Sequence, residues 1–144
     1  MVSNPVGIKI EELFSLKDRV TVISGIGGIG EMLAKAFGAN GAKLILTDVN
    51  VNALTQIKAR LSEAGIASQT YPMDVTSKLS IQEVFDKVID TYGRMDVLIV
   101  TSGVAKSDRA VDFNEEDIDR ILQVNLKGTI LCDQVAGKIM SRQK

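Results

Sequence analysis

Histidine and tryptophan are absent from this chain of 144 residues, and aromatic residues make up only 4% of it. The core must therefore be built from aliphatic side chains, which the hydrophobic fraction of 45% supplies for one globular unit. A single cysteine, Cys132, excludes an internal disulfide, and no cluster of cysteine and histidine exists to hold a transition metal. We expect Cys132 to be a small residue of the core and predict no metal site.

An excess of charge of one sign is also missing, since 17 basic residues are interspersed with 18 acidic ones. This balance argues against a nucleic-acid surface and against an acidic tail. No stretch approaches the ~18 apolar residues of a membrane span, and residues 1–10 hold no apolar core of a signal peptide. These absences predict a cytoplasmic protein whose ligand is a small molecule rather than a nucleic acid or a membrane.

Apolar runs and amphipathic stretches alternate along the chain without a linker or a repeat between them. This alternation predicts one α/β domain over residues 1–144, with a parallel sheet of about four strands and flanking helices. Residues 1–18 are expected to lead into the first strand. The expected strands are 20–24, 43–47, 67–73 and 97–100, and the expected helices are 29–39, 50–64, 77–92 and 114–140.

A glycine-rich turn joins the first expected strand to the first expected helix. Gly25, Gly27 and Gly30 have the spacing G-x-G-x-x-G, with Gly28 and Ile29 between the last two. Backbone N–H groups at a helix start carry partial positive charge, and glycine allows a phosphate to approach them closely. Glycines also mark ordinary turns, but the strand before and the helix after this one favour a dinucleotide site made by these five residues.

Acidic residues follow the second and third expected strands. Asp48 comes eighteen residues after Gly30, where a carboxylate accepts hydrogen bonds from a ribose diol and repels a 2′-phosphate. NAD is therefore favoured over NADP, although Asp48 is alternatively a cap of its strand end. Asp74 is expected to reach the adenine amino group, with a turn-capping role as the alternative.

Two further positions lie near the expected crevice. Gly103 ends the segment after the fourth strand, where it either lets a cofactor approach or only makes a turn. Asn125 lies among apolar neighbours in the last helix, and a buried amide must find partners. It either positions a water or side chain in an active site or makes a local structural hydrogen bond, and spacing alone favours the structural bond.

The expected helix over 114–140 begins with Asn114 as its cap and an acidic first turn, and its apolar residues go nearly all the way round. A helix that is apolar on every side is expected to be buried on every side. Four strands and their helices cannot supply that cover. We therefore predict that either further chain or a second subunit covers it, with a homo-oligomer forming through this helix.

Taken in order, these pieces resemble the short-chain dehydrogenase/reductase family over residues 13–144, nearest to gluconate 5-dehydrogenase-like and 3-oxoacyl-ACP reductase-like members. The chain looks like the cofactor-binding N-terminal half of such an enzyme. Any one of the segments is a weak sign, whereas their series in this order is specific. The segments that carry the resemblance are 14–17, 28–30, 40–43, 47–48, 73–76, 92–98, 114–117 and 124–129.

The resemblance implies a Rossmann-type doubly wound sheet that binds NAD and passes a hydride to or from a small carbonyl or secondary alcohol. It implies that the glycines of the turn bind the pyrophosphate. It also implies that Asp48 selects NAD, that Asp74 and Val75 face the adenine, and that Gly103 lies beside the cofactor's ribose. Asn125 matches the family's helix asparagine, which organises a water and the catalytic lysine, so the resemblance favours a catalytic role for it.

Three departures from the family pattern bear on activity. The glycine turn is one residue short, because only Ile26 and Gly27 separate Gly25 from Gly28. The family's Asn-Asn-Ala-Gly segment reads Val-Thr-Ser-Gly over residues 100–103, so asparagine hydrogen bonds that brace the sheet are lost. The catalytic serine and Tyr-x-x-x-Lys pair are not found, so the isolated chain is expected to be inactive. The alternatives are a non-catalytic nucleotide-binding or assembly module and a decayed fragment that binds nothing.

Overall fold

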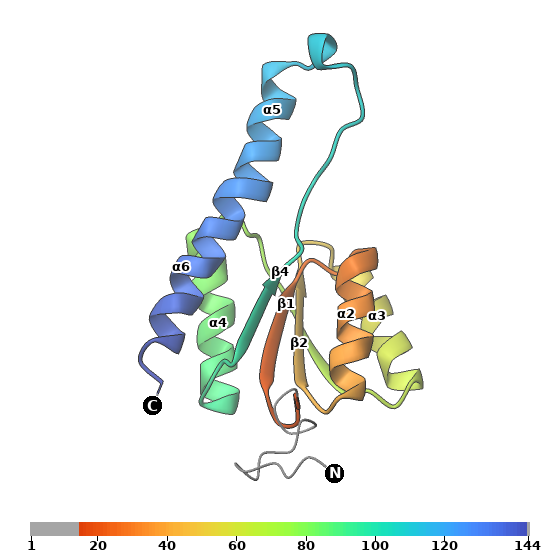
Figure 1. Ribbon diagram of the computed structural model, residues 1–144, viewed down its shortest axis with the longest axis vertical. Coiled ribbons are helices and arrows are strands. Elements are labelled where there is room, and N and C mark those ends of the chain that lie inside the picture. Colours follow the sequence, from red (N-terminus) through yellow and green to blue (C-terminus); the bar gives the residue numbers. More distant parts are fainter. Residues whose placement is uncertain (1–14, 144) are drawn as a thin grey trace, which may run out of the picture.

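A four-stranded parallel sheet lies at the centre of the computed structural model, which describes residues 15–143 (Figure 1). The spatial order of the strands is β3-β2-β1-β4. The chain thus lays down three strands outward on one side and then crosses to the other side of β1. This change of direction creates a switch point between β1 and β4, where ligands bind in open α/β sheets. The strands are β1 (Val20–Ser24), β2 (Lys43–Asp48), β3 (Ser68–Pro72) and β4 (Val97–Val100).

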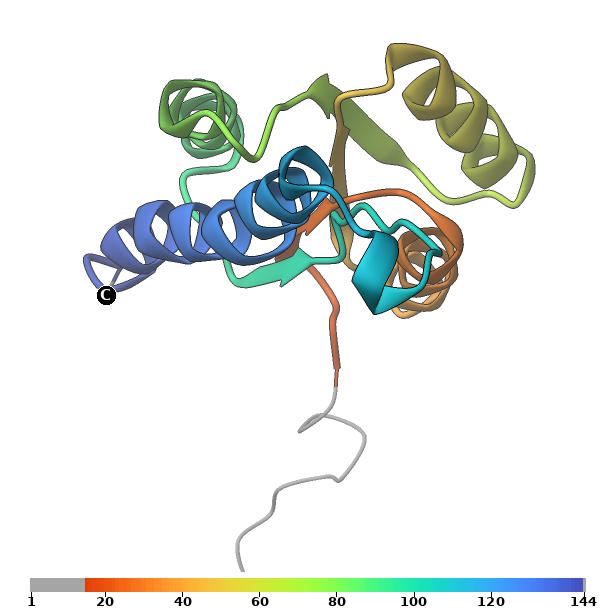
Figure 2. The same cartoon turned by 90° about the horizontal axis from the view of Figure 1, so that it is seen from above.

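Helices cover both faces of the sheet (Figure 2). α2 (Gly28–Ala39) and α3 (Val51–Glu63) lie on one face, while α4 (Lys78–Tyr92) and α6 (Thr129–Met140) lie on the other. A short 3-10 turn, η1 (Ala110–Asp112), precedes α5 (Glu115–Ile121), which runs through a π-helical segment, η2 (Leu122–Gly128), into α6. This arrangement confirms the predicted Rossmann-type doubly wound fold with four strands.

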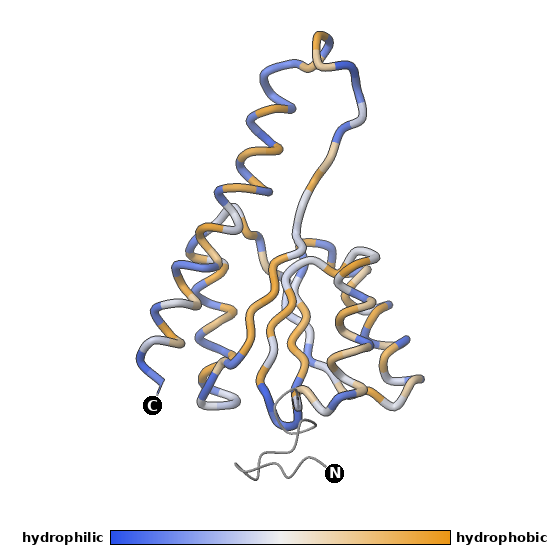
Figure 3. Tube along the Cα trace, in the orientation of Figure 1, coloured by the Kyte–Doolittle hydropathy of each residue, from blue (hydrophilic) through white to orange (hydrophobic). Residues whose placement is uncertain are grey.

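Alternate residues of the central strands enter opposite cores. Val22 and Ile45 pack towards α4 and α6, whereas Ile23, Leu44 and Leu46 pack towards α2 and α3. These five side chains are almost completely buried. Strands that are covered on both faces have continuous apolar sequences. Figure 3 shows these strands as strongly hydrophobic segments in the middle of the molecule.

The predicted boundaries of the four strands and the first three helices agree with the structure to within one residue at each end. The helix predicted over 114–140 has the expected outer limits but is divided into α5, the π-helical η2 and α6. Capping residues explain this agreement, because Asn50 and Asn114 each accept a hydrogen bond from the backbone N–H three residues on. Gly41, Gly65 and Gly93 have positive φ where helices end. The predicted packing of Leu13 and Phe14 lies outside the described residues.

The last helical segment is covered on one side only within residues 15–143. The α6 face that holds Cys132, Val135 and Ala136 is buried, as predicted for Cys132. Burial raises the pKa of the Cys132 thiol to about 11, with Asp133 adding to the effect, so the thiol stays protonated. The part formed by α5 and η2 projects beyond the sheet (Figure 1), and no helix among the described residues is long and apolar enough to cross a membrane.

Asp96 joins the amino ends of β1 and β4, at the edge of the sheet opposite the switch point. Its Oδ2 accepts the Val20 N–H at 2.9 Å, and the guanidinium groups of Arg94 and Arg19 donate to its carboxylate. Burial raises the pKa of Asp96, but the hydrogen bonds from Arg94 and Val20 outweigh it and the net pKa is lowered. The carboxylate is therefore held ionised at the base of the sheet.

We predict that Asp96→Asn lowers the free energy of unfolding by about 1–3 kcal/mol, since it removes a nearly buried charged acceptor with several donors. Because the folded-state pKa is lowered, this stabilisation is present above the ordinary pKa of an aspartate and is lost as pH falls through the folded value. Urea denaturation at neutral and acid pH measures both effects. The exposed Asp90→Asn is the control, and a loss for Asp96→Asn that stays constant into strong acid would contradict the prediction.

Candidate nucleotide-binding cleft

A cleft of about 190 Å³ opens at the carboxyl ends of the strands, and we call it the strand-end cleft. It brings together four of the residues predicted from sequence, which come from the ends of three different strands. Ligands of open α/β sheets bind in this place. The residues that line the cleft are Asp48, Val49, Met73, Asp74, Val75, Ser102, Gly103, Val104, Arg120 and Val124.

The glycine turn after β1 uses its glycines for two different purposes. Gly25 has a φ of +90°, and a Cβ there would lie 2.3 Å from the Ser102 nitrogen. A Cβ on Gly30 would lie 2.0 Å from the Gly25 carbonyl oxygen, so these two glycines are required by the turn itself. A Cβ on Gly27 or Gly28 would meet nothing within 4 Å. The exposed backbone at those two positions is open to a ligand.

The first turn of α2 fits a phosphate group. Gly27 caps the helix without any side-chain hydrogen bond, so the first backbone N–H groups keep free donors and partial positive charge. Glu31 is the acidic residue of that turn, but Arg60 and Lys35 hold its carboxylate at 2.7 and 2.8 Å. The hydrogen bond from Arg60, followed by the one from Lys35, lowers the pKa of Glu31 to about 2. Its charge is thus paired rather than directed at a ligand.

Asp48 connects the end of β2 to the glycine turn. Its Oδ2 accepts the Ile26 N–H at 3.1 Å, and its Oδ1 accepts the Asn50 N–H at 2.9 Å. The strand-end cap considered for Asp48 is therefore present in the structure. Each carboxylate oxygen has a second lone pair, so the group keeps the capacity to accept hydrogen bonds from a ribose diol in the cleft.

Asp74 and Val75 form the β3 side of the strand-end cleft. Asp74 Oδ1 accepts both the N–H and the hydroxyl of Thr76 at 2.8 Å, which is the turn-capping role considered for it. Val75 is buried against Gly128, where a Cβ would lie only 2.8 Å from the valine Cγ2. Gly128 therefore lets the helix come close enough to hold Val75 at the cleft. Gly128 belongs to the segment 124–129 that carries the family resemblance, but it was not singled out as a site residue.

Asn125 clamps the chain just after Gly103. Its Oδ1 accepts the Val104 N–H at 2.8 Å, and its Nδ2 donates to the Val104 carbonyl at 2.9 Å. Its own carbonyl accepts the Thr129 hydroxyl at 2.8 Å within the π-helical segment. Both side-chain atoms thus make structural hydrogen bonds, as spacing favoured, but the partner lies 21 residues away in the chain and Asn125 is exposed rather than buried. They fix the β4 end against the helix, while a catalytic role for Asn125 stays a prediction.

Hydroxyl groups brace the sheet where the family's asparagines are missing. The Thr101 hydroxyl lies 2.7 Å from the Gly25 carbonyl and 3.1 Å from the Ser24 carbonyl, so it donates across to the turn. The Ser24 and Ser102 hydroxyls are hydrogen-bonded at 2.8 Å. The asparagines and their hydrogen bonds are missing from this segment, and threonine and serine supply other hydrogen bonds between the ends of β1 and β4.

Several residues of the strand-end cleft were not singled out from sequence. Val49 and Met73 adjoin the predicted acids, whereas Arg120 and Val124 come from the distant helical segment. Arg120 and Val124 could have been linked to the site from sequence, because residues four apart on a helix share a face and Val124 is next to the predicted site residue Asn125. The helix over 114–140 was instead interpreted as a surface that must be buried, so a contribution of this face to the cleft was not predicted.

The comparison with known families matches residues 18–144 to the short chain dehydrogenase family. The chain belongs to this family. A D-threitol dehydrogenase from Mycolicibacterium smegmatis is 33% identical over 128 residues, which cover 88% of this chain and 49% of that protein. An uncharacterized oxidoreductase from Staphylococcus aureus (strain USA300) is 33% identical over 129 residues, covering 89% and 55%. The chain thus spans about half the length of the curated relatives it matches.

Solved structures of family members have the same fold. A short chain dehydrogenase/reductase from Burkholderia phymatum in complex with NAD has a TM-score of 0.82 at 27% identity, covering 88% of this chain and 46% of that one. A short-chain type dehydrogenase/reductase from Mycobacterium marinum has a TM-score of 0.86 at 23% identity, covering 92% and 54%. The second likeness shows the fold alone. The family predicted from the order of the motifs is thereby confirmed.

We predict that Thr101→Val lowers the free energy of unfolding by about 1 kcal/mol, because the Gly25 carbonyl loses its side-chain donor. Thr101→Ser keeps the hydroxyl and should recover most of the loss. Thr47→Val is the matched control, since the Thr47 hydroxyl is buried on β2 without a partner among the described residues and its removal should cost nothing. Urea denaturation of the three variants measures this. Equal losses for Thr101→Val and Thr47→Val would refute the brace.

Proposed function

We propose that this chain is the cofactor-binding part of an NAD-dependent short-chain oxidoreductase acting on a small carbonyl or secondary alcohol. The observation that carries the proposal is that the Asp48 carboxylate lines a mostly apolar slot at the carboxyl ends of the strands and also accepts the Ile26 N–H of the glycine turn. The backbone of that turn is open at Gly27 and Gly28, although these glycines do not themselves line the slot. NAD is preferred over NADP because the carboxylate repels a 2′-phosphate. The NAD complex of the Burkholderia phymatum structure and the D-threitol dehydrogenase relative support it.

A nicotinamide cofactor, when bound, supplies the hydride chemistry. The residues of this chain bind and orient. The N–H groups at the start of α2 would hold the pyrophosphate, and the Asp48 carboxylate would accept hydrogen bonds from the ribose hydroxyls. Val75 and Val124, which line the cleft, would exclude water from the base of the cofactor. Asn125 holds Gly103 and Val104 in place, so the wall of the cleft is preformed before a ligand arrives.

Proton transfer to or from the substrate needs a positioned acid or base. Neither tyrosine of these 144 residues belongs to a Tyr-x-x-x-Lys pair, because Val75 lies four residues after Tyr71 and Asp96 lies four after Tyr92. We expect these residues on their own to bind nucleotide without appreciable turnover. The same observation favours, as a second candidate, a nucleotide-binding module that has no catalysis of its own.

We predict that the chain binds NAD at least on the order of ten-fold more tightly than NADP, since like charges 4 Å apart at an effective dielectric of 20 repel by about 4 kcal/mol. Asp48→Asn should narrow this ratio by improving NADP binding. Asp90→Asn, on the exposed side of α4, is the control. Titration calorimetry measures both affinities, and an assay with a secondary alcohol tests turnover. No binding of either dinucleotide at millimolar concentration would remove the proposal.

We also propose that a second copy of this chain covers the helical segment from α5 through η2 to the start of α6, most of which projects beyond the sheet. Four large apolar residues at intervals of four share one of its faces, and each is 44–56% exposed. Contiguous apolar surface of this kind marks an interaction site. Two such faces can pack on one another about a two-fold axis, because the same patch then serves both copies. The exposed apolar stripe consists of Ile118, Leu122, Leu126 and Ile130.

We predict that Leu122→Glu shifts the protein to a lower mass in sedimentation velocity, because it places a charge in the middle of the exposed apolar stripe. Leu79→Glu is the matched control, since Leu79 is 68% exposed on α4 outside the stripe. A wild-type chain that sediments as a monomer would disprove the second-copy proposal. So would equal masses for the wild type and Leu122→Glu.

A further inference from the structure

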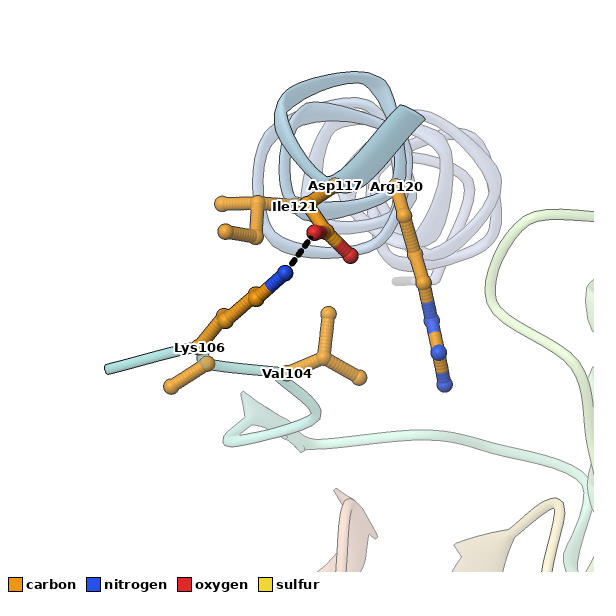
Figure 4. A pocket seen from close by; sticks show the side chains of 6 residues that line it. Val104, Lys106, Asp117, Arg120 and Ile121 are labelled. Carbon is orange, nitrogen blue, oxygen red and sulfur yellow. Dashed lines mark hydrogen bonds and ion pairs between the residues drawn. The ribbon is translucent and has the colours of Figure 1, made fainter. Parts of the chain in front are cut away.

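Arg120 lies at a wall between two cavities. The strand-end cleft is on one side of it, and on the other side is a cavity of about 270 Å³ between the loop after β4 and α5 (Figure 4). Arg120 and Val104 line both of them. A change in the direction of the Arg120 side chain therefore alters the shape and charge of the strand-end cleft.

An ion pair between the loop after β4 and α5 lies next to Arg120. Asp117 lies three residues before it, which is the spacing at which an acid and an arginine on one helix pair. The Lys106 ammonium instead donates to the Asp117 carboxylate, and this hydrogen bond is the largest cause that lowers the pKa of Asp117. Figure 4 shows Arg120 extending away from Asp117. Within residues 15–143 its guanidinium makes no hydrogen bond and no ion pair.

The acidic groups of the strand-end cleft do not bind this guanidinium either. Asp48 accepts backbone N–H groups with both oxygens, and Asp74 accepts the N–H and hydroxyl of Thr76. Arg120 is consequently a planar cation without a partner at the wall of a slot that is otherwise mostly apolar. The apolar side chains of that slot are Val49, Met73, Val75, Val104 and Val124.

The chemistry of this slot favours a flat base over a phosphate. A phosphate placed beside Arg120 would share the slot with two carboxylates, which repel it. A purine fits between valine side chains, and a guanidinium stacks on an aromatic face by cation–π attraction and by contact of the two planes. The base is also the part of a dinucleotide that has no charge for Asp48 and Asp74 to oppose.

We propose that Arg120 closes the base end of the strand-end cleft by laying its guanidinium on the face of a purine, and that the Lys106–Asp117 ion pair keeps Arg120 available for this role. The inference rests on the proposed nucleotide-binding function. It adds a specificity residue from the helical segment to the residues contributed by the strand ends. A ligand that lacks a purine gains nothing from Arg120.

The test is a titration of the 144-residue chain with adenosine, 5′-AMP, ADP-ribose and nicotinamide mononucleotide, followed by amide chemical shifts. Arg120→Met should weaken the first three on the order of five-fold and leave nicotinamide mononucleotide unchanged. Arg120→Lys should recover only part of the loss, because an ammonium has no plane to stack. Lys127→Met removes an exposed charge from the same helical segment outside the cleft and is the matched control.

The outcomes separate this inference from the function it rests on. Unchanged adenosine binding in Arg120→Met overturns the inference while leaving nucleotide binding intact. A loss that appears with 5′-AMP but not with adenosine also overturns it, because Arg120 then contacts a phosphate. Failure of the wild-type chain to bind any adenine ligand removes the proposed function and this inference together.

A second set of variants tests the role of the ion pair. Lys106→Met releases Asp117 to capture Arg120 and should weaken adenosine binding as Arg120→Met does. Asp117→Asn alone should leave binding at the wild-type level, because Arg120 stays free. Combining Asp117→Asn with Lys106→Met should restore the affinity that Lys106→Met loses. A double variant as weak as Lys106→Met would show that the pair does not control Arg120.

Discussion

The close approach of the β1 and β4 ends is the constraint on which the rest of this structure depends. The chain can turn from β1 into α2 at this point only because Gly25 and Gly30 have no side chains. Hydroxyl groups of Thr101 and Ser102 then tie the turn to β4, and the Asp48 carboxylate ties it to β2. Three strands thus share one hydrogen-bonded junction, and the strand-end cleft opens directly above it. The floor of the cleft is therefore cross-linked by hydrogen bonds from three strands.

Several carboxylates of this chain are held by neighbouring basic side chains. Glu31 is held by Arg60 and Lys35, Asp96 by Arg94 and Arg19, and Asp117 by Lys106. The pKa of each of these carboxylates is lowered, so each is kept ionised, and none of them lines the strand-end cleft. Arg120 has no hydrogen-bond or ion-pair partner within residues 15–143, so its guanidinium is free beside the cleft. The electrostatics of the site therefore depend on ion pairs that do not touch a ligand.

The order of strands and helices could be predicted because each element has a local cause. The continuous apolar runs of β1 and β2 follow from burial on both faces, and Asn50 and Asn114 begin helices by accepting a backbone N–H. The position of Asp48, Asp74, Val75 and Gly103 in one cleft was predictable too, since parallel strands bring their carboxyl ends to one edge. The incomplete cover of the last helix was predicted as well, since its apolar residues go nearly all the way round, but which of its faces is buried was not, because that depends on which surfaces meet in space.

The sequence by itself determined the fold class, the element boundaries, the family and the cleft where a ligand is expected. These follow from short-range patterns, namely periodicity, capping residues and glycines at fixed spacing. Only the tertiary structure decided that Thr101 and Ser102 hydrogen-bond to the end of β1 and the glycine turn, that both amide atoms of Asn125 bind the Val104 backbone, and that Lys106 pairs with Asp117. The physical reason is that a hydrogen bond or an ion pair requires donor and acceptor to lie within about 3 Å of each other. For residues distant in the chain, only packing sets that distance.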